Sequence, residues 1–226
     1  MKINKLITNK IIFPKKNNYA AIIGTSPSKS ARSPKLWNKT YKKLKSKTKM
    51  LPLDVKKKEL KKLMRILKKD KNYLGGSVTI PYKEEIIKHL DKIDTKAKLI
   101  GSVNTVVRKG KILIGHNTDY IGSLSTLKKI NINKRKKNIL IIGCGGAGKA
   151  VILSVDNYFN QSNILIKNRN ITKAKKFVKN FSSRRNKIKV LENQSDIIRI
   201  NLDLIINCSS LGFDEWIENK NKFINK

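Results

Sequence analysis

Short apolar runs alternate with segments of helical periodicity along most of the chain. In the first half the apolar runs are "YAAIIG", "TKMLPL" and "YLGGSVTI", at positions 19–24, 48–53 and 73–80. Polar, amphipathic segments follow them. In one of these segments the apolar residues fall on a single helical stripe, formed by Val55, Leu60, Leu63, Ile66 and Leu67. This alternation is typical of a parallel α/β arrangement. The sequence therefore predicts an α/β fold.

Residues that favour helix starts stand after the apolar runs. Ser33 is expected to cap a helix over 33–45, with Pro34 at the first helical position. Asp54 is expected to cap the helix that follows the second run. The third run is expected to lead into a helix that begins at Pro81, with its apolar residues turned towards the core: Ile86, Ile87 and Leu90.

The middle of the chain contains a predicted hairpin and a predicted linker. Residues 103–117 resemble two strands joined by a tight turn at Lys109 and Gly110. A helix is expected from about Thr118 to Lys129, and the basic segment "NINKRKKN" that follows is the best candidate for a domain boundary. From Asn138 the strand-helix alternation starts again, through "NILIIG", "SNILIKN", "NKIKVL" and "DLIINC".

The charge of the chain is strongly positive. Lys+Arg number 52 and Asp+Glu 15, which gives a net charge of +37 and a pI near 10.3. Binding to a nucleic-acid backbone is one explanation. Drift towards A/T-rich codons is the other, because Lys, Asn and Ile dominate together and the lysines cover whole helix faces. We favour drift and expect no specific nucleic-acid partner, although weak, non-specific polyanion binding stays open.

Other composition signals point to a cytoplasmic enzyme. Cys144 and Cys208 form no CxxC pair and no metal-ligand spacing, so buried free thiols in a reducing compartment are expected, and no metal. His89 and His116 have no partner spacing that suggests catalysis. No apolar run approaches the roughly 20 residues of a membrane span, so no membrane partner is expected. The first eighteen residues are interpreted as a short extension before the first strand.

A glycine-rich turn predicts a dinucleotide site. Gly143, Gly145 and Gly148 satisfy G-x-G-x-x-G between a predicted strand and a predicted helix, with Gly146 and Ala147 inside the motif. The first glycine permits a tight turn, the second lets backbone N–H groups approach a pyrophosphate, and the third lets helix and strand pack closely. An ordinary glycine turn in a βαβ unit is the alternative, and the strand-helix-strand context favours dinucleotide binding.

The residues after the second strand of this half favour NADP over NAD. An NAD site usually places an acidic residue there to bind the adenine ribose. This chain instead has Lys167, Asn168, Arg169 and Lys173, and no acidic residue before Glu192. Guanidinium groups suit a 2′-phosphate because their fork can bind two oxygens at once.

Several motifs occur together in the order and spacing of the shikimate dehydrogenase family. They are "SVTIPYKE", "GSVNTVV", "GHNTDYIG", "IIGCGGAGKA", "IKNRN" and "DLIINCSSLG", and "IIGTSPSKSARSP" resembles the opening serine motif of the family. The resemblance runs from about Tyr19 to Gly212. It implies an N-terminal α/β substrate-binding and catalytic domain over 1–120 and a C-terminal Rossmann-like NADP-binding domain over 121–226. It also implies reversible reduction of 3-dehydroshikimate to shikimate by NADPH.

The resemblance assigns Lys83 and Asp119 as the catalytic residues. Hydride transfer to a ketone leaves an alkoxide that needs a proton, so a positioned acid is required. Lys83 is expected in the first turn of the helix that begins at Pro81, near the positive end of its dipole. Asp119 can bind the same substrate hydroxyl and orient the ammonium group.

The same matching places four more residues at substrate contacts. Thr79 and Asn104 offer neutral donors and acceptors suited to a polyhydroxylated ring. Ser33 matches the serine motif, and Ser30 matches it if one inserted residue is accepted, so both are expected near the substrate carboxylate. Singly, each of these residues could equally end a strand, cap a helix or satisfy a turn.

The match to the family is incomplete. The serine motif "SKSARSP" is one residue longer than the usual form in the family, with Ala31 and Arg32 inside it. The later family elements, including a glutamine that contacts substrate, find no counterpart before Lys226. We therefore expect a truncated nucleotide-binding domain. The alternatives are an eroded, catalytically weak homologue that binds NADP or polyanions, and a dehydrogenase that prefers quinate. The oligomeric state is not determined, and a homodimer stays open.

Overall fold

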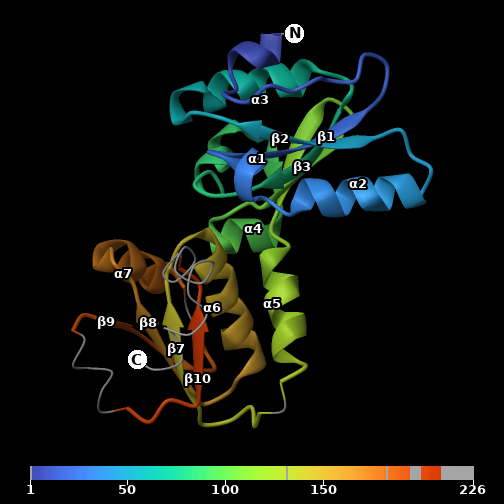
Figure 1. Ribbon diagram of the computed structural model, residues 1–226. Helices are drawn as coiled ribbons and strands as arrows, with labels where there is room; N and C mark the ends of the chain where they lie inside the picture. Colours follow the sequence, from blue (N-terminus) through green and yellow to red (C-terminus); the bar gives the residue numbers. More distant parts are fainter. Residues whose placement is uncertain (1, 131, 182, 194–199, 210–226) are drawn as a thin grey trace. The chain divides into compact units, whose positions relative to one another are not determined.

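The protein consists of two compact units, Met1–Thr118 and Asp119–Lys226 (Figure 1). The computed structural model describes residues 2–130, 132–181, 183–193 and 200–209. Both units are built from strands and helices in alternation, which confirms the predicted α/β class. The basic segment 131–138 lies inside the second unit, because helix α5 (Asp119–Leu127) before it packs against α6 (Gly146–Tyr158).

The first unit contains a six-stranded mixed sheet in the order β2-β1-β3-β5-β6-β4. Strand β1 pairs in parallel with β2 and β3, β4 pairs in parallel with β6, and β5 is antiparallel to β3 and β6. The strands are β1 (Tyr19–Gly24), β2 (Lys49–Asp54), β3 (Tyr73–Val78), β4 (Lys92–Ile93), β5 (Thr105–Lys109) and β6 (Ile112–His116).

The predicted hairpin over 103–117 is confirmed as β5 and β6. Lys109 pairs with Ile112, so the turn consists of Gly110 and Lys111, one residue later than predicted. Gly110 has a φ of +61°, a left-handed conformation in which a side chain is unfavourable. So short a connection can join only antiparallel strands, and it therefore interrupts the parallel arrangement.

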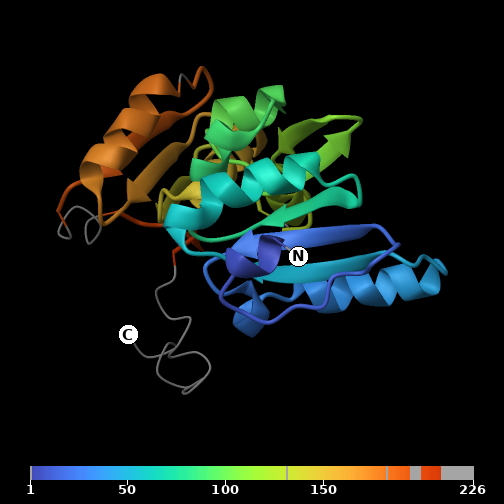
Figure 2. The same ribbon diagram turned by 90° about the horizontal axis from the view of Figure 1, so that it is seen from above.

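Helices lie on both faces of the sheet around β1 (Figure 2), and the side chains of β1 alternate between the two sides. Ala21 and Ile23 belong to the main core on the side of α3 (Leu60–Lys69), where Leu60, Leu63, Met64 and Leu67 are buried. Ala20 and Ile22 form a smaller cluster with Met50 on the opposite face, next to Tyr41 of α2 (Ser33–Lys43). Because successive side chains of a strand point to opposite faces, the sheet separates the large core cluster from the small one.

Two predicted helix caps are wrong. The N-cap of α2 is Arg32, and Ser33 is already helical because the short helix α1 (Pro27–Ser30) precedes it closely. Asp54 is the last residue of β2, and its carboxylate binds Ser28 rather than the next helix. A 3-10 turn, η2 (Lys57–Glu59), leads into α3.

No α-helix begins at Pro81. Residues 80–84 form turns, and the 3-10 helix η3 (Glu85–His89) follows them. Tyr82 is buried and its hydroxyl donates to the Val55 carbonyl at 2.6 Å, while Val103 N donates to the Lys83 carbonyl at 2.7 Å. These contacts hold the segment in turns. Ile86 is buried and Ile87 and Leu90 pack against the core, as the pattern predicted.

Residues before β1 form part of the core rather than a loose extension. The chain starts with the 3-10 helix η1 (Lys2–Lys5), and Ile3, Ile7 and Phe13 are buried in the main cluster. Ile7 forms an antiparallel bridge to Val55, next to the end of β2. The N-terminal segment therefore stabilises the edge of the sheet.

Amide side chains form hydrogen bonds with the backbone of β2 along its outer edge. Asn38 of α2 accepts from Met50 N at 2.7 Å and donates to the Met50 carbonyl at 3.1 Å. Asn9 donates to the Pro52 carbonyl and accepts from Asp54 N, both at 2.9 Å, and Thr8 N donates to the Asp54 carbonyl at 2.8 Å. Side chains thus take the place of a neighbouring strand at this edge.

The sequence analysis missed helix α4 (Thr95–Ile100), which lies between β4 and β5. Asp94 is its N-cap and accepts from Ala97 N at 2.6 Å, and Gly101 ends it with a φ of +66°. Ala97 and Ile100 are buried. Its single helical turn is too short for a period to be visible in the sequence.

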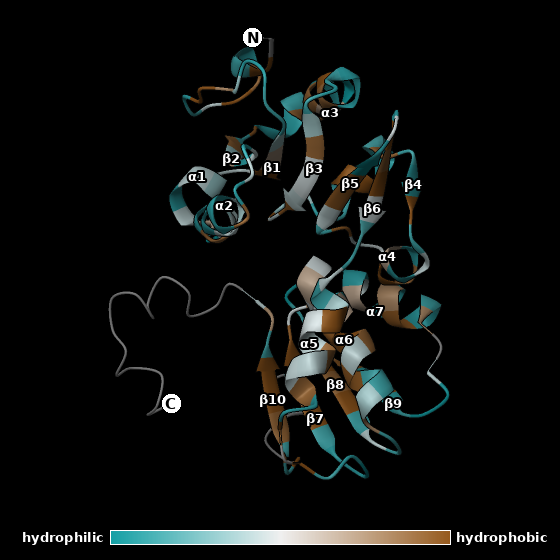
Figure 3. Cartoon of the chain, turned by 90° about the vertical axis from the view of Figure 1, so that its right-hand side faces the viewer, coloured by the Kyte–Doolittle hydropathy of each residue, from teal (hydrophilic) through white to brown (hydrophobic). Residues whose placement is uncertain are grey.

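The second unit contains a four-stranded parallel sheet in the order β10-β7-β8-β9. The strands are β7 (Asn138–Ile142), β8 (Asn163–Lys167), β9 (Lys187–Leu191) and β10 (Leu204–Asn207), with α6 between β7 and β8 and α7 (Ile171–Asn180) between β8 and β9. Figure 3 shows β7, β8 and β10 coloured mostly as hydrophobic. A search of the described residues for a helix long and apolar enough to cross a bilayer finds none.

Candidate functional site

The glycine-rich turn connects β7 to α6 in the second unit, as predicted. Gly143 has a φ of +99°, which disfavours any other residue. A Cβ on Gly148 would lie 2.1 Å from the Gly143 carbonyl oxygen, so this position brings helix and strand as close together as the motif requires. Gly145 is the N-cap of α6, and a Cβ there would meet nothing within 4 Å.

The turn occupies the point where the strand order of the sheet reverses. β7 has β8 on one side and β10, the last described strand, on the other. In open α/β sheets, ligands bind at the carboxyl ends of the strands at such a point. Gly145, Gly146 and Ala147 present backbone groups there, and the positive end of the α6 dipole adds to the attraction for a phosphate.

Asn168, directly after β8, fixes the shape of this turn. Its Oδ1 accepts from Cys144 N at 2.9 Å, and its Nδ2 donates to the Asn170 carbonyl at 2.8 Å. Asn170 is in turn the N-cap of α7 and accepts from Lys173 N at 2.8 Å. The Asn168 carboxamide therefore connects the two loops at the carboxyl edge of the sheet.

Cationic side chains stand beside these loops. Arg169 and Lys173 are both exposed. Glu192, the first acidic residue after them, pairs with Lys175 at 2.8 Å, and its backbone carbonyl accepts from Lys167 Nζ at 3.1 Å. Arg169 follows β8 and Lys173 lies in the first turn of α7, so cationic side chains stand at this end of the sheet.

The two cysteines flank the turn from adjacent strands. Cys144 is buried and Cys208 is partly exposed at the end of β10. Burial, followed by proximity to Cys144, raises the pKa of the Cys208 thiol to about 11. The thiol of Cys208 is therefore protonated near neutral pH.

In the first unit, backbone hydrogen bonds bring three predicted site residues together. Val78 N donates to the Asn104 carbonyl at 2.7 Å, which places Asn104 beside the end of β3 and Thr79. Val103 N donates to the Lys83 carbonyl at 2.7 Å, which brings the Lys83 turn to the same segment. Thr79 and Lys83 are partly buried, as is Asn104. These contacts gather Thr79, Lys83 and Asn104 at one end of the sheet.

Asn104 binds the residue that precedes Asp119. Its Oδ1 accepts from Thr118 N and its Nδ2 donates to Thr118 Oγ1, both at 2.9 Å. Thr105 Oγ1 donates to the same Oδ1 at 2.9 Å. Asp119 follows as the first residue of α5 and of the second unit. The Asn104 carboxamide thus fixes the exit from the first unit.

Three further residues hold this exit, and the sequence analysis gave them no role. His116 Nδ1 lies 2.7 Å from Asp94 Oδ2, and Asp94 N donates to the Gly115 carbonyl at 2.9 Å. Asn117 is buried and donates to the Ser102 carbonyl at 2.9 Å. The one hint of these roles in the sequence is that His116 and Asn117 stand directly before Thr118 and Asp119. Their hydrogen-bond partners lie on another segment, so a local pattern could not predict them.

The serine motif is divided between two short helices. Ser30 ends α1 and is exposed, and Ser33 begins α2 and is partly buried. Ser28, which the sequence analysis passed over, donates through both its backbone N, at 2.9 Å, and its hydroxyl to the buried carboxylate of Asp54. Asp54 thereby anchors α1 to the end of β2, and no local signal links residues so far apart in the chain.

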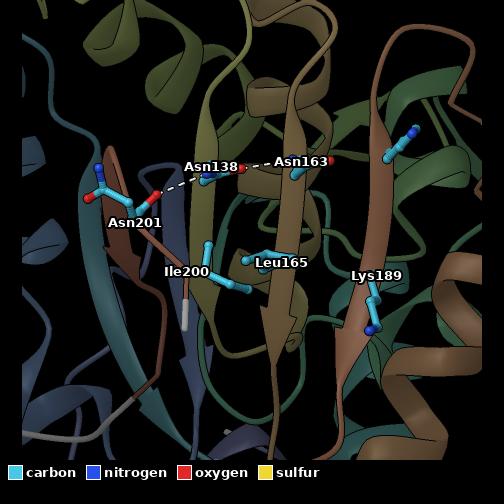
Figure 4. A pocket seen from close by; sticks show the side chains of 7 residues that line it. Asn138, Asn163, Leu165, Lys189, Ile200 and Asn201 are labelled. Carbon is cyan, nitrogen blue, oxygen red and sulfur yellow. Dashed lines mark hydrogen bonds between the residues drawn. The ribbon is translucent and has the colours of Figure 1, made fainter. Parts of the chain in front are cut away.

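A separate groove of about 440 Å³ lies on the second sheet, at the amino ends of its strands (Figure 4). Asn138 Nδ2 donates to the Asn201 carbonyl at 2.9 Å, and Asn163 Nδ2 donates to Asn138 Oδ1 at 2.8 Å. Lys187 and Lys189 line its other side. The groove lies at the amino ends of the strands and the glycine turn lies at their carboxyl ends, so the groove is not the candidate nucleotide site. No group of three or more metal-ligating side chains is found among the described residues.

Comparison with known proteins places both units in one family. Residues 22–106 match the shikimate dehydrogenase substrate binding domain, and residues 125–221 match the shikimate / quinate 5-dehydrogenase domain. A shikimate dehydrogenase (NADP(+)) of Nitrosopumilus maritimus is 36% identical over 195 residues, which are 85% of this chain and 70% of the relative.

Solved structures agree with the sequence matches. The crystal structure of shikimate dehydrogenase from Aquifex aeolicus has a TM-score of 0.77 at 31% identity and covers 89% of this chain and 72% of that one. A shikimate dehydrogenase crystallised in complex with NADP+ has a TM-score of 0.73 at 32% identity and covers 89% and 69%. The chain spans about half the length of several other curated relatives it matches.

The parallel sheet and its glycine turn define a Rossmann-like nucleotide-binding protein with a second, mixed α/β unit. Both units match the same kind of dehydrogenase, in sequence and in fold. The chain belongs to the shikimate dehydrogenase family.

Proposed function

We propose that the protein catalyses the reversible, NADPH-dependent reduction of 3-dehydroshikimate to shikimate. The observation that carries this proposal is the gathering of Thr79, Lys83 and Asn104 at one end of the first sheet, within a chain whose second unit has a glycine turn at the reversal of its sheet. The names of the relatives support both the substrate and the preference for NADP(+).

The residues of the second unit fit NADP. Gly145 leaves open space at the N-terminus of α6, where a pyrophosphate would lie against backbone N–H groups. The exposed side chains of Arg169 and Lys173 would bind the 2′-phosphate. NADPH supplies the hydride when it is bound. Asn168 contributes indirectly, because it fixes the backbone of Cys144 in the glycine turn.

In the proposed reaction Lys83 and Asp119 handle the proton. The Lys83 ammonium donates a proton to the oxygen of the reduced ketone, and takes it back in the oxidative direction. Asp119 orients the ammonium and accepts from the same hydroxyl, held in place by the bonds between Asn104 and Thr118. Thr79 and Asn104 bind ring hydroxyls, and Ser30 and Ser33 bind the carboxylate.

Replacement of Lys83 tests the proposal. Lys83→Ala is expected to lower kcat for shikimate oxidation about 100- to 10,000-fold, because it removes the proton-transfer group. Lys92→Ala, an exposed lysine on β4, serves as the charge-matched control and should retain full activity. The measurement is the NADP+-dependent rise in NADPH absorbance with shikimate or, for comparison, quinate.

Titration by calorimetry separates binding from turnover. Wild-type protein that binds NADP+ and shikimate but turns over slowly would support the eroded homologue instead. Equal activity of Lys83→Ala and wild type would refute the assignment of Lys83, and turnover of quinate alone would refute the proposed substrate.

A further inference from the structure

A basic groove lies on the first unit, between the outer face of α3 and the 3-10 helix η3. Its volume is about 460 Å³, within the range of small-molecule sites. Met64 and Leu90 contribute apolar surface. The other lining residues are four cations and two further polar residues, His89 and Asp91. The groove shares no residue with the proposed catalytic site.

Three cations of α3 line one wall of this groove: Lys61, Arg65 and Lys68. Their spacing of four and three positions places them on a single helical face. Like charges at such spacings repel each other and destabilise a helix. An anion bound across them would remove this repulsion.

The acidic residues nearby compensate only part of the charge. Asp91 binds Lys68 and also accepts from Leu113 N at 2.8 Å, so its carboxylate is already engaged. Glu85 lies 3.5 Å from Lys88 on η3. Neither Lys61 nor Arg65 forms an ion pair with a described acidic residue. These two side chains therefore leave a net positive charge in the groove.

His89 of η3 also lines the groove. Burial lowers the pKa of His89, Lys61 and Lys88 lower it further, and Glu85 raises it. Arg65, Lys68 and Asp91 line the same groove. The imidazole is consequently neutral at physiological pH, with one N–H available as a donor.

We propose that the groove between α3 and η3 binds a small oligophosphate, a chain of two or three phosphates either free or on a nucleotide. Arg65 provides a planar fork that matches two phosphate oxygens, and Lys61 provides a second charge one helical turn away. His89 donates from the facing wall. Met64 and Leu90 lie beneath and can contact the apolar part of a nucleotide.

The excess of lysine in the whole chain does not account for this arrangement. Four of the eight residues that line the groove are Lys or Arg. Another groove of similar volume, near Tyr19 and Asp70, has Lys15 as its one cationic lining residue. Cationic side chains are therefore concentrated at α3 and η3 rather than distributed evenly over concave surfaces.

The chain has two histidines, which allow a site-specific test. We would titrate the full chain with pyrophosphate and tripolyphosphate at constant ionic strength and follow both imidazoles by NMR, with His89→Gln to assign the signals. The His89 signal should shift and saturate with a Kd below about 1 mM. The pKa of His89 should rise, because a bound anion favours the imidazolium. His116, which binds Asp94 elsewhere in the unit, should not respond.

Charge-matched variants distinguish the groove from the general field. The double variant Lys61→Gln/Arg65→Gln should weaken tripolyphosphate binding at least tenfold. Lys42→Gln/Lys43→Gln on α2 removes the same charge and should change the affinity less than twofold. All four side chains are exposed, and circular dichroism checks that both variants fold.

Three results would overturn the proposal: parallel shifts of both histidines, no saturation, or equal loss of affinity in both double variants. A single-stranded oligonucleotide provides a further comparison. Displacement of the oligonucleotide by tripolyphosphate, followed at the His89 signal, would support a shared phosphate site. Equal binding of the oligonucleotide to both double variants would show that only net charge attracts it. None of these measurements depends on NADP or shikimate, so their failure would leave the proposed function intact.

Discussion

Two asparagines that the sequence analysis placed at ligand contacts are already hydrogen-bonded within the protein. Asn104 binds Thr118 in the first unit, and Asn168 binds Cys144 N in the second. Each joins two loops at the end of a sheet. The residue type and position indicated a site at the sheet end, but the hydrogen-bond partner could not be predicted. The partners lie 14 and 24 positions away, and a local pattern contains no information about contacts of that range.

Gly145 permits a test at the scale of one residue. A Cβ at this position would meet no protein atom within 4 Å, and the backbone conformation is extended, so Gly145→Ala should fold normally. The methyl group would, however, occupy the space above the N-terminus of α6. We expect NADP+ to bind about tenfold more weakly, a loss of roughly 1.4 kcal/mol, as measured by calorimetry.

The matched control for this change is Gly122→Ala. A Cβ at Gly122 also meets nothing within 4 Å, and the residue lies in α5, away from the glycine turn. Its affinity for NADP+ should equal that of the wild type. Unchanged binding in Gly145→Ala would mean that the nucleotide does not approach this backbone.

At the scale of elements, the sequence predicted strands better than helix starts. The strands β1, β2, β3 and β7 occur where apolar runs indicated them, because burial on both faces requires continuous apolar sequence. The expected helix at Pro81 is instead a set of turns before η3. Its apolar residues are inward as predicted, but the buried Tyr82 and the bond to Val103 determine the backbone.

The edge of β2 offers a test of an element. Asn9→Ala removes two hydrogen bonds to the β2 backbone, at Pro52 and Asp54. We expect a loss of about 1–3 kcal/mol in the free energy of unfolding, measured by urea denaturation. Asn17→Ala, an exposed position before β1, is the control and should remain within about 0.5 kcal/mol of the wild type. Equal stability of both variants would show that water replaces the amide at this edge.

At the scale of the whole molecule, the repeated alternation of strand and helix was sufficient to predict an α/β protein. The glycine-rich turn and the family resemblance added the Rossmann-like half. The order of strands was not predictable in the same way. The mixed sheet of the first unit depends on pairings such as β3 with β5 and β4 with β6, which join distant segments. Charge also acts at this scale. The chain has 52 basic and 15 acidic residues, so repulsion between like charges outweighs attraction between opposite ones.

Self-repulsion of this size should make stability depend on salt. Screening shortens the range of repulsion between exposed lysines, so added sodium chloride should stabilise the folded state. We expect the Tm to rise by a few degrees between about 20 mM and about 300 mM salt, as measured by differential scanning fluorimetry. A constant or falling Tm would indicate that ion pairs outweigh repulsion.

The packing of residues 3–13 has a consequence for the order of folding. These residues are synthesised before β2, yet Ile7 bonds to Val55 and Asn9 bonds to Pro52 and Asp54. They can reach their final positions only after more than forty further residues have left the ribosome. This segment therefore cannot be locked in place until β2 has been made, and Ile3 and Phe13 lack their final burial in the interval.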